Sequence, residues 1–307
     1  MSHASTPAPP RAARIARVEG FEERFAVVNG VRLHFASAGP ADGRLVVLLH
    51  GFPEFWWSWR HQLEALAAAG YRVLAPDMRG FAQSEKPAGV RSYGVELLAR
   101  DVAELVRHEG RASAIVVGHD WGAVVAWQVA MRHPEVVERL GVLNVPHPRR
   151  MLEGLLTREQ LRKSWYIFFF QVPRLPERVL SRHDFARLRE VFRDDGFDED
   201  EIDPYVDAFR YPGALTAALN YYRAAARDTL VDLVLRGRAV ARDRPVTCPV
   251  LVLWGRRDRV LGAELAAPPP DLVPNATVEV VEHATHWLQH DAPDLVNARL
   301  LAFFEAG

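Results

Sequence analysis

The residue with the clearest chemical potential is Asp120, the centre of a Gly-His-Asp-Trp-Gly pentapeptide at positions 118–122. The apolar, β-branched run that ends at Val117 predicts a buried strand, and residues 124–132 predict a helix that follows almost without a loop. The two flanking glycines let the chain turn sharply and hold the central side chain exposed on a strained backbone. This pattern is typical of a nucleophile elbow in which aspartate replaces the usual serine.

A carboxylate at an elbow favours attack on a saturated carbon. Attack on an ester carbonyl would give a mixed anhydride, whereas attack on a carbon that carries a leaving group gives an alkyl ester. Asp120 therefore indicates the opening of an epoxide or the expulsion of a halide. From the pentapeptide alone, Asp120 could also be an acidic turn residue without a catalytic role. The N-terminus of the following helix would stabilise its charge.

Two further side chains could complete a triad with this carboxylate. Asp258 follows the predicted strand 250–254, and His286 follows the last predicted strand, 276–281. Behind an elbow nucleophile, the acid and then the histidine come later in the chain, and that order is met here. We expect Asp258 to fix the imidazole tautomer and His286 to activate water.

Each of these two assignments has a rival. His283 is a second candidate for the base, three residues before His286. Asp258 could instead be a loop residue paired with one of the neighbouring arginines.

An ester intermediate also needs an oxyanion hole, formed by two backbone N–H groups. One is expected from Trp121, which directly follows the nucleophile. The other is expected from Phe52, which lies between a glycine and a proline after the strand 45–49. An ordinary turn is the alternative for this second segment.

The elements that must position these residues follow from the hydrophobic pattern. Asn29–Gly30 between two short apolar runs predicts a β-hairpin, because both turn residues tolerate positive φ. Strands that alternate with helices imply a parallel sheet covered on both faces, hence an α/β fold. The predicted strands are 25–28, 31–35, 45–49, 72–75, the run ending at 117, 136–145, 250–254 and 276–281. The predicted helices outside the middle of the chain are 58–69, 94–109, 124–132 and 293–305.

The alternation stops in the middle of the chain. From about Arg149 to Pro245 the sequence is helical, aromatic and charged, and predicts a second layer over the edge of the sheet where ligands bind. We therefore expect a flexible tail at 1–20, a core formed by 21–146 and 247–307, and a helical cap at 147–246.

Composition narrows the functional classes. With 49% hydrophobic residues the 307-residue chain has enough apolar material for a substantial core. A net charge of −1 argues against a dominant role in binding nucleic acid or anionic membranes. No apolar run approaches the roughly 20 residues of a membrane span. The single cysteine, Cys248, excludes an intrachain disulfide and fits a reducing, cytoplasmic location.

Five motifs together resemble those of the α/β-hydrolase-fold epoxide hydrolases. The resemblance extends from about Phe25 to Phe304. It implies an eight-stranded, mostly parallel sheet with helices on both faces and an inserted helical cap. The motifs are His50–Gly51–Phe52–Pro53–Glu54, Asp77–Met78–Arg79–Gly80–Phe81, Gly118–His119–Asp120–Trp121–Gly122, Asn144–Val145–Pro146–His147–Pro148 and Thr285–His286–Trp287.

The resemblance also implies two cap tyrosines that hydrogen-bond the epoxide oxygen. Tyr166 and Tyr222 fit these positions, and Tyr221 is a rival for the second. A phenol with a pKa near ~10 can donate to a developing alkoxide while it stays protonated at neutral pH. Glu54 is implied to orient His286 or its water, and a carboxylate at a helix start is the alternative.

Several motifs are shared with haloalkane dehalogenases, which remain the main alternative. The Trp121 indole could hold a halide, but the second donor, often asparagine at the position of Phe52, is absent. Fluoroacetate dehalogenases typically carry arginine in place of Trp121. A ligand-binding protein without activity is a more distant alternative. We expect a small apolar epoxide and water as substrates, and neither a metal nor an organic cofactor.

Overall fold

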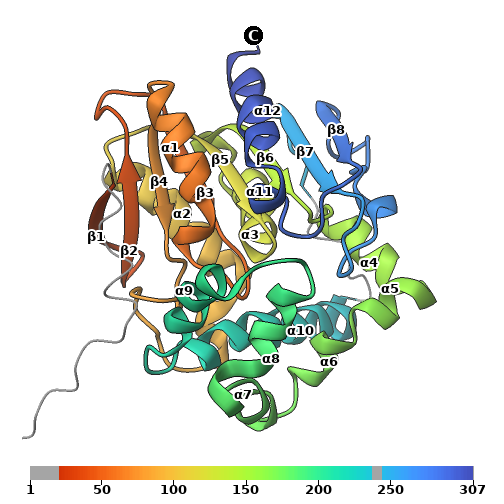
Figure 1. The fold of residues 1–307 in the computed structure, drawn as a ribbon. Coiled ribbons are helices and arrows are strands. Elements are labelled where there is room, and N and C mark those ends of the chain that lie inside the picture. The colour runs from red at the N-terminus through yellow and green to blue at the C-terminus, as the bar shows by residue number, and fades with distance from the viewer. Residues whose placement is uncertain (1–20, 237–243, 307) are drawn as a thin grey trace, which may run out of the picture.

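The structure, a computed structural model, describes residues 21–236 and 244–306. The predicted flexible tail, 1–20, lies outside these ranges. The described residues form an eight-stranded sheet in the order β1-β2-β4-β3-β5-β6-β7-β8. Helices lie on both faces of this sheet (Figure 1), so the predicted α/β architecture is confirmed.

The sheet begins with a hairpin and continues as parallel strands. β1 (Glu22–Val28) and β2 (Val31–Ala38) are antiparallel, and the turn residues Asn29 and Gly30 have φ of 47° and 74°, as the Asn-Gly signal predicts. β2 also pairs antiparallel with β4 (Arg72–Pro76), and every later pairing is parallel. The other strands are β3 (Leu45–Leu49), β5 (Ala114–His119), β6 (Val137–Leu143), β7 (Val250–Gly255) and β8 (Ala276–Val281).

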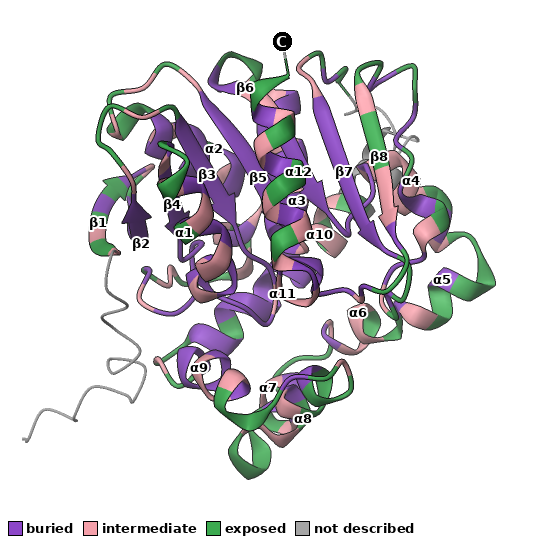
Figure 2. Cartoon of the chain, turned by 45° about the horizontal axis from the view of Figure 1, so that its top comes forward, coloured by how far each residue is buried: buried purple, intermediate pink, exposed green. Residues whose placement is uncertain are grey.

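Successive residues of the central strands enter two different hydrophobic cores. In β3, Val47 and Leu49 belong to one cluster, whereas Val46 and Leu48 belong to the other. Side chains alternate across a strand, so a strand that is apolar at every position must be covered on both faces. Figure 2 shows these central strands as buried along their length.

The helices that pack on the sheet have nearly the predicted bounds. The exception is the helix predicted at 58–69, where a 3₁₀ turn, η2 (Trp56–Trp59), precedes α1 (Arg60–Ala68). The tighter turn buries Trp56 and Trp59, three residues apart, on the same side. The others are η3 (Val90–Tyr93), α2 (Val95–His108), α3 (Trp121–Arg132), η4 (Pro134–Val136), η5 (Ala263–Leu265), α11 (Leu288–Asp291) and α12 (Pro293–Glu305).

Between β6 and β7 the described residues form only helices, as the break in alternation predicts. These helices, here called the helical layer, lie across the end of the sheet in both views (Figures 1 and 2). Among the described residues, no helix has the length and hydropathy that crossing a bilayer requires. The layer consists of α4 (Pro148–Leu155), α5 (Arg158–Lys163), α6 (Trp165–Phe169), α7 (Leu175–Leu180), α8 (Arg182–Arg193), α9 (Glu199–Phe209) and α10 (Ala214–Arg236).

Candidate active site

Asp120 stands at a strained turn between β5 and α3. Its φ and ψ are 47° and −123°, a region that residues other than glycine rarely occupy. A Cβ atom at Gly122 would overlap the carbonyl oxygen of Leu49, and one at Gly51 would overlap the Asp120 side chain. A Cβ atom at Gly118 would likewise overlap the carbonyl oxygen of Gly122. The turn is therefore possible only with glycine at these close approaches, which explains both glycines of the pentapeptide.

Asp120, Asp258 and His286 lie together where β5, β7 and β8 end. His286 Nδ1 lies 2.8 Å from Asp258 Oδ2, and its Nε2 lies 3.7 Å from Asp120 Oδ2. The first contact is a hydrogen bond, and the second is an ion pair too long for one. Both Asp258 and His286 are buried, whereas the Asp120 side chain is 13% exposed.

Asp258 is held by groups other than its neighbouring arginines. Its Oδ1 accepts hydrogen bonds from the backbone N–H groups of Val260 and Leu261, at 2.7 and 2.9 Å. Arg256 instead pairs with Glu282, and Arg259 with Asp195. The structure therefore does not contain the alternative, an ion pair between Asp258 and a neighbouring arginine.

The charges of the site shift the pKa values of all three groups. Burial by itself lowers the pKa of His286, but the Asp258 and Asp120 carboxylates outweigh it and raise the pKa well above 6.5. Burial raises the pKa of both carboxylates, yet His286 lowers them to below 3.8 on balance. The two carboxylates therefore favour the protonated form of the imidazole, and the imidazole favours their ionised forms.

A backbone donor already reaches the nucleophile. The N–H of Phe52 donates a 2.7 Å hydrogen bond to Asp120 Oδ1. Because Oδ1 is occupied in this way and Oδ2 faces His286, the two oxygens of Asp120 have different surroundings. Trp121, the other predicted oxyanion donor, is the first residue of α3, directly after the turn.

A cavity of about 750 Å³ separates the sheet edge from the helical layer. Asp120 and His286 line it from the sheet, and Tyr166 and Tyr222 line it from the layer. The two tyrosine rings are 5.9 Å apart. Burial, followed by the negative charge of Asp120, raises the pKa of both phenols above 10.0, so both remain hydrogen-bond donors at neutral pH.

Two rivals from the sequence lie away from the cavity. Tyr221 is fully buried, and its hydroxyl donates to the carbonyl oxygen of Arg79 at 2.7 Å. His283 is exposed. The structure therefore brings Tyr222 and His286, not these neighbours, to Asp120.

Glu54 does not contact the His286 ring. Its Oε2 lies 2.8 Å from His119 Nδ1, and Oε1 accepts a 2.9 Å hydrogen bond from the Gln289 side chain. His119 Nε2 in turn lies 2.8 Å from the His286 carbonyl oxygen. Any orientation of His286 by Glu54 must therefore pass through His119 and the backbone.

Two residues that sequence reasoning did not assign contact this cluster or the residue next to it. Asn144, after β6, donates a 2.9 Å hydrogen bond to Asp258 Oδ2. Asp195, from the helical layer, accepts a 3.0 Å hydrogen bond from the indole N–H of Trp287, next to His286. Asn144 could have been found as a polar residue at a strand end. Asp195 gives no such signal, because only tertiary structure brings it to Trp287.

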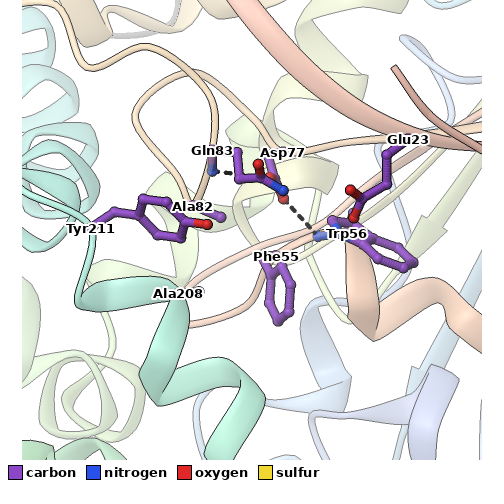
Figure 3. A pocket seen from close by; sticks show the side chains of 8 residues that line it. All are labelled: Glu23, Phe55, Trp56, Asp77, Ala82, Gln83, Ala208 and Tyr211. Carbon is purple, nitrogen blue, oxygen red and sulfur yellow. Dashed lines mark hydrogen bonds between the residues drawn. The ribbon is translucent and has the colours of Figure 1, made fainter. Parts of the chain in front are cut away.

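A second, much smaller cavity lies beside η2 (Figure 3). Its volume is about 10 Å³, enough for one water molecule at most. Asp77 accepts hydrogen bonds there from the N–H groups of Trp56 and Gln83, each 3.2 Å long. It also lies 2.7 Å from His34 Nδ1. These contacts hold the segment behind Phe52 in place and leave no room for an organic substrate.

Within the described residues, no group of three or more His, Cys, Asp or Glu side chains is arranged to hold a metal ion. Cys248 is free and partly buried, and burial raises its pKa to about 11. It is therefore a poor nucleophile, as expected for a residue that packs beside a strand.

Comparison with known proteins gives consistent results at the levels of family, sequence and structure. Residues 44–293 match the family model described as alpha/beta hydrolase fold. The AB hydrolase superfamily protein YfhM of Bacillus subtilis (strain 168) is 39% identical over 293 residues, covering 94% of this chain and 99% of that protein. Mouse (Mus musculus) epoxide hydrolase 4 is 36% identical, covering 90% of this chain and 77% of that protein.

A solved structure is similar over almost the whole chain. It is a mutant of an epoxide hydrolase from Bacillus megaterium in complex with its product, (R)-3-[1]naphthyloxy-propane-1,2-diol. The TM-score is 0.84 at 32% identity, and the match covers 92% of this chain and 100% of that one.

Proposed function

This chain belongs to the α/β-hydrolase fold family and, within it, to the epoxide hydrolases, and on that premise we propose that it hydrolyses an epoxide to a vicinal diol. The observation that carries the proposal is an elbow aspartate in one cavity with two protonated phenols. Asp120 supplies a nucleophile for carbon, and Tyr166 and Tyr222 face it from the opposite wall. In this proposal residues 147–246 act as the cap over a core formed by 21–146 and 247–307.

In the first step, Asp120 Oδ2 attacks an epoxide carbon. Oδ1 is the oxygen that already accepts the Phe52 N–H, so Oδ2 is the one free to react. The C–O bond of the epoxide breaks, and Tyr166 and Tyr222 donate hydrogen bonds and a proton to the oxygen that leaves. The product of this step is an alkyl ester of Asp120.

Ester formation then changes the charge beside His286. It removes a negative charge that faces Nε2 at 3.7 Å, and that charge is one of the causes that raise the imidazole pKa. The pKa of His286 therefore falls when the base is needed. The Nε2 proton passes to the phenolate left on the tyrosine that protonated the epoxide oxygen, so the tyrosine is restored and His286 becomes neutral. Asp258 keeps the other nitrogen, Nδ1, in place.

In the second step, neutral His286 takes a proton from water, and the water oxygen attacks the ester carbonyl. The resulting oxyanion on Oδ1 is stabilised by the N–H of Phe52 and, in this proposal, that of Trp121. Collapse of the tetrahedral intermediate releases the diol and restores the Asp120 carboxylate with one oxygen from water.

The cavity favours an apolar substrate, because its lining is largely aromatic and aliphatic. Phe52, Phe169, Phe170 and Leu180 line it together with the two tyrosines. We place the enzyme in the cytoplasm, where a chain with a single cysteine and no disulfide is typical.

The decisive experiment is a single turnover in ¹⁸O-water with enzyme in excess over an aryl epoxide. The ester route predicts one ¹⁸O atom in the peptide that contains Asp120 and none in the diol. Label in the diol with an unlabelled Asp120 peptide would show direct attack of water and refute the ester. Halide release from haloalkanes, without diol from epoxides, would favour the dehalogenase alternative.

A further inference from the structure

The helical layer exposes an unusual amount of apolar surface. Among the described residues, seven of the ten exposed large apolar side chains lie between positions 156 and 191. Five of the seven follow one another along α5, α6, the turn after α6 and the first residue of α7. Their exposed fractions run from 41% to 63%. They are Leu161, Trp165, Phe168, Val172 and Leu175.

The exposed face belongs to well-anchored helices. Ser164 continues the chain from α5 into α6, and its N–H bonds the Gln160 carbonyl at 2.9 Å. The Gln160 side chain is fully buried and donates to the Ser164 hydroxyl and to the Val260 carbonyl, each at 2.9 Å. Leu161, Trp165 and Phe168 are therefore exposed although α5 and α6 are fixed to the core.

Positive charge surrounds these side chains. Residues 156–182 contain six Lys or Arg and two Glu, a net charge of +4 in a chain whose total is −1. Both glutamates are paired, Glu159 with Lys163 and Glu177 with Arg223. Five exposed arginines have no ion pair with any described residue, namely Arg158, Arg162, Arg174, Arg178 and Arg182.

These residues form a surface that borders the large cavity. α5, α6 and α7 follow one another along one edge of the helical layer (Figure 1). Trp165 is 63% exposed and also lines the cavity, as does its neighbour Tyr166. We call the five apolar residues and the five arginines the α5–α7 face.

We propose that the α5–α7 face binds the surface of a bilayer that contains anionic lipid. Arginines beside exposed aromatic and aliphatic side chains match the two parts of such a surface, phosphate groups above acyl chains. A second copy of the chain is a poorer match, because a two-fold contact would bring together two copies of a segment, 156–182, whose net charge is +4. If the proposed function holds, an apolar epoxide dissolved in the bilayer reaches the cavity past Trp165.

The test is sedimentation of the full chain with vesicles of phosphatidylcholine, with or without phosphatidylglycerol. We expect binding that requires phosphatidylglycerol and weakens at high salt. Arg158→Gln combined with Arg162→Gln should weaken it about 20-fold, since each basic residue near an anionic surface contributes about fivefold. The matched control removes the same charge from the core surface, at the exposed residues Arg91 and Arg100, and should bind as the unchanged protein does.

A second pair of variants tests the apolar part. Leu161→Ser combined with Phe168→Ser should reduce vesicle binding, whereas Val27→Ser with Val278→Ser, on exposed strand positions, should not. All variants change exposed side chains, so an unchanged thermal midpoint confirms folding. Equal binding to both kinds of vesicle, or equal loss in the core-surface controls, would overturn the proposal. So would a stable dimer that Leu161→Ser with Phe168→Ser dissociates, because the face would then be an interface between copies.

Discussion

The two walls of the large cavity are built in different ways. On the sheet side, Asp120, Asp258 and His286 follow strands, and β5 and β7 are buried at every position. On the other side, Tyr166 stands on α6, which has no buried residue, and Tyr222 stands on the long helix α10. Backbone geometry fixes the first group, whereas packing between aromatic side chains fixes the second.

Hydrogen bonding shows the same difference. The Asp258 carboxylate accepts hydrogen bonds from two backbone N–H groups, from Asn144 and from His286. Four hydrogen bonds therefore fix its position. Tyr222 is surrounded mainly by rings, with Phe170 and Trp121 each 4.9 Å away. We infer that substitutions on the sheet side abolish turnover, and that substitutions in the helical layer lower it only in part. The following predictions test this difference, from the largest effect to the smallest.

The largest effect is expected for His286→Gln. Loss of the base should stop ester hydrolysis and lower turnover about 10⁴-fold, the scale seen when one member of a catalytic triad is removed. Alkylation should continue, so intact-protein mass spectrometry should show the mass of one bound substrate. His283→Gln is the matched control and should leave turnover unchanged. Equal losses in the two variants would show that the base has been misassigned.

A smaller loss is expected for Tyr166→Phe and for Tyr222→Phe. Each change removes a donor to the epoxide oxygen, and general-acid catalysis typically contributes about 10²-fold or more. Pre-steady-state kinetics should place the loss in ester formation.

Tyr221→Phe is the control for these two variants. It loses the buried hydrogen bond to the Arg79 carbonyl and should cost about 1–3 kcal/mol of unfolding free energy. Its rate of ring opening should remain that of the unchanged enzyme. Full activity of Tyr166→Phe combined with Tyr222→Phe on haloalkanes would support the dehalogenase alternative.

The pKa of His286 should respond to the charge of Asp120. In Asp120→Asn one of the carboxylates that raise this pKa is gone, so the pKa should be lower than in the unchanged enzyme. The imidazole should accordingly lose its proton at lower pH, as it would in the ester. NMR titration of the ring measures this shift, and an unchanged or higher pKa would contradict the proposed role of ester formation.

The smallest effect is expected for Asp195→Ala, which breaks the contact between the helical layer and Trp287. The side chain is 8% exposed and accepts a hydrogen bond from the indole, so the loss should be about 1–3 kcal/mol of unfolding free energy. Thermal or urea unfolding measures it. Asp194→Ala changes an exposed neighbour and is the control. A matching loss in the control would mean that the indole contact contributes nothing.

Much of the sheet side could be predicted from the sequence because its determinants are local. The run before Asp120, the glycines around it and the order of Asp258 and His286 each depend on a few consecutive residues or on strand order. The strand β8 and the helix α12 have the predicted bounds, since a short run rich in β-branched residues and helical periodicity define them directly. The Asn-Gly turn was predictable for the same reason.

Other features required the tertiary structure, because they depend on residues far apart in the chain. Tyr221 and Tyr222 are adjacent and equally aromatic, and only the packing of α10 buries one against Arg79 and turns the other to the cavity. Glu54 meets His119 rather than the His286 ring for a similar reason.

The sequence by itself determined the α/β architecture and was enough to propose Asp120, Asp258 and His286 as nucleophile, acid and base, because short-range geometry and strand order place them at one edge of the sheet. Tertiary structure alone decided which of Tyr221 and Tyr222 lines the large cavity and how Asp195 meets Trp287. It also decided that an apolar, arginine-rich face stays in solvent. These outcomes depend on which surfaces the helices bury, and burial is a property of the whole packed chain.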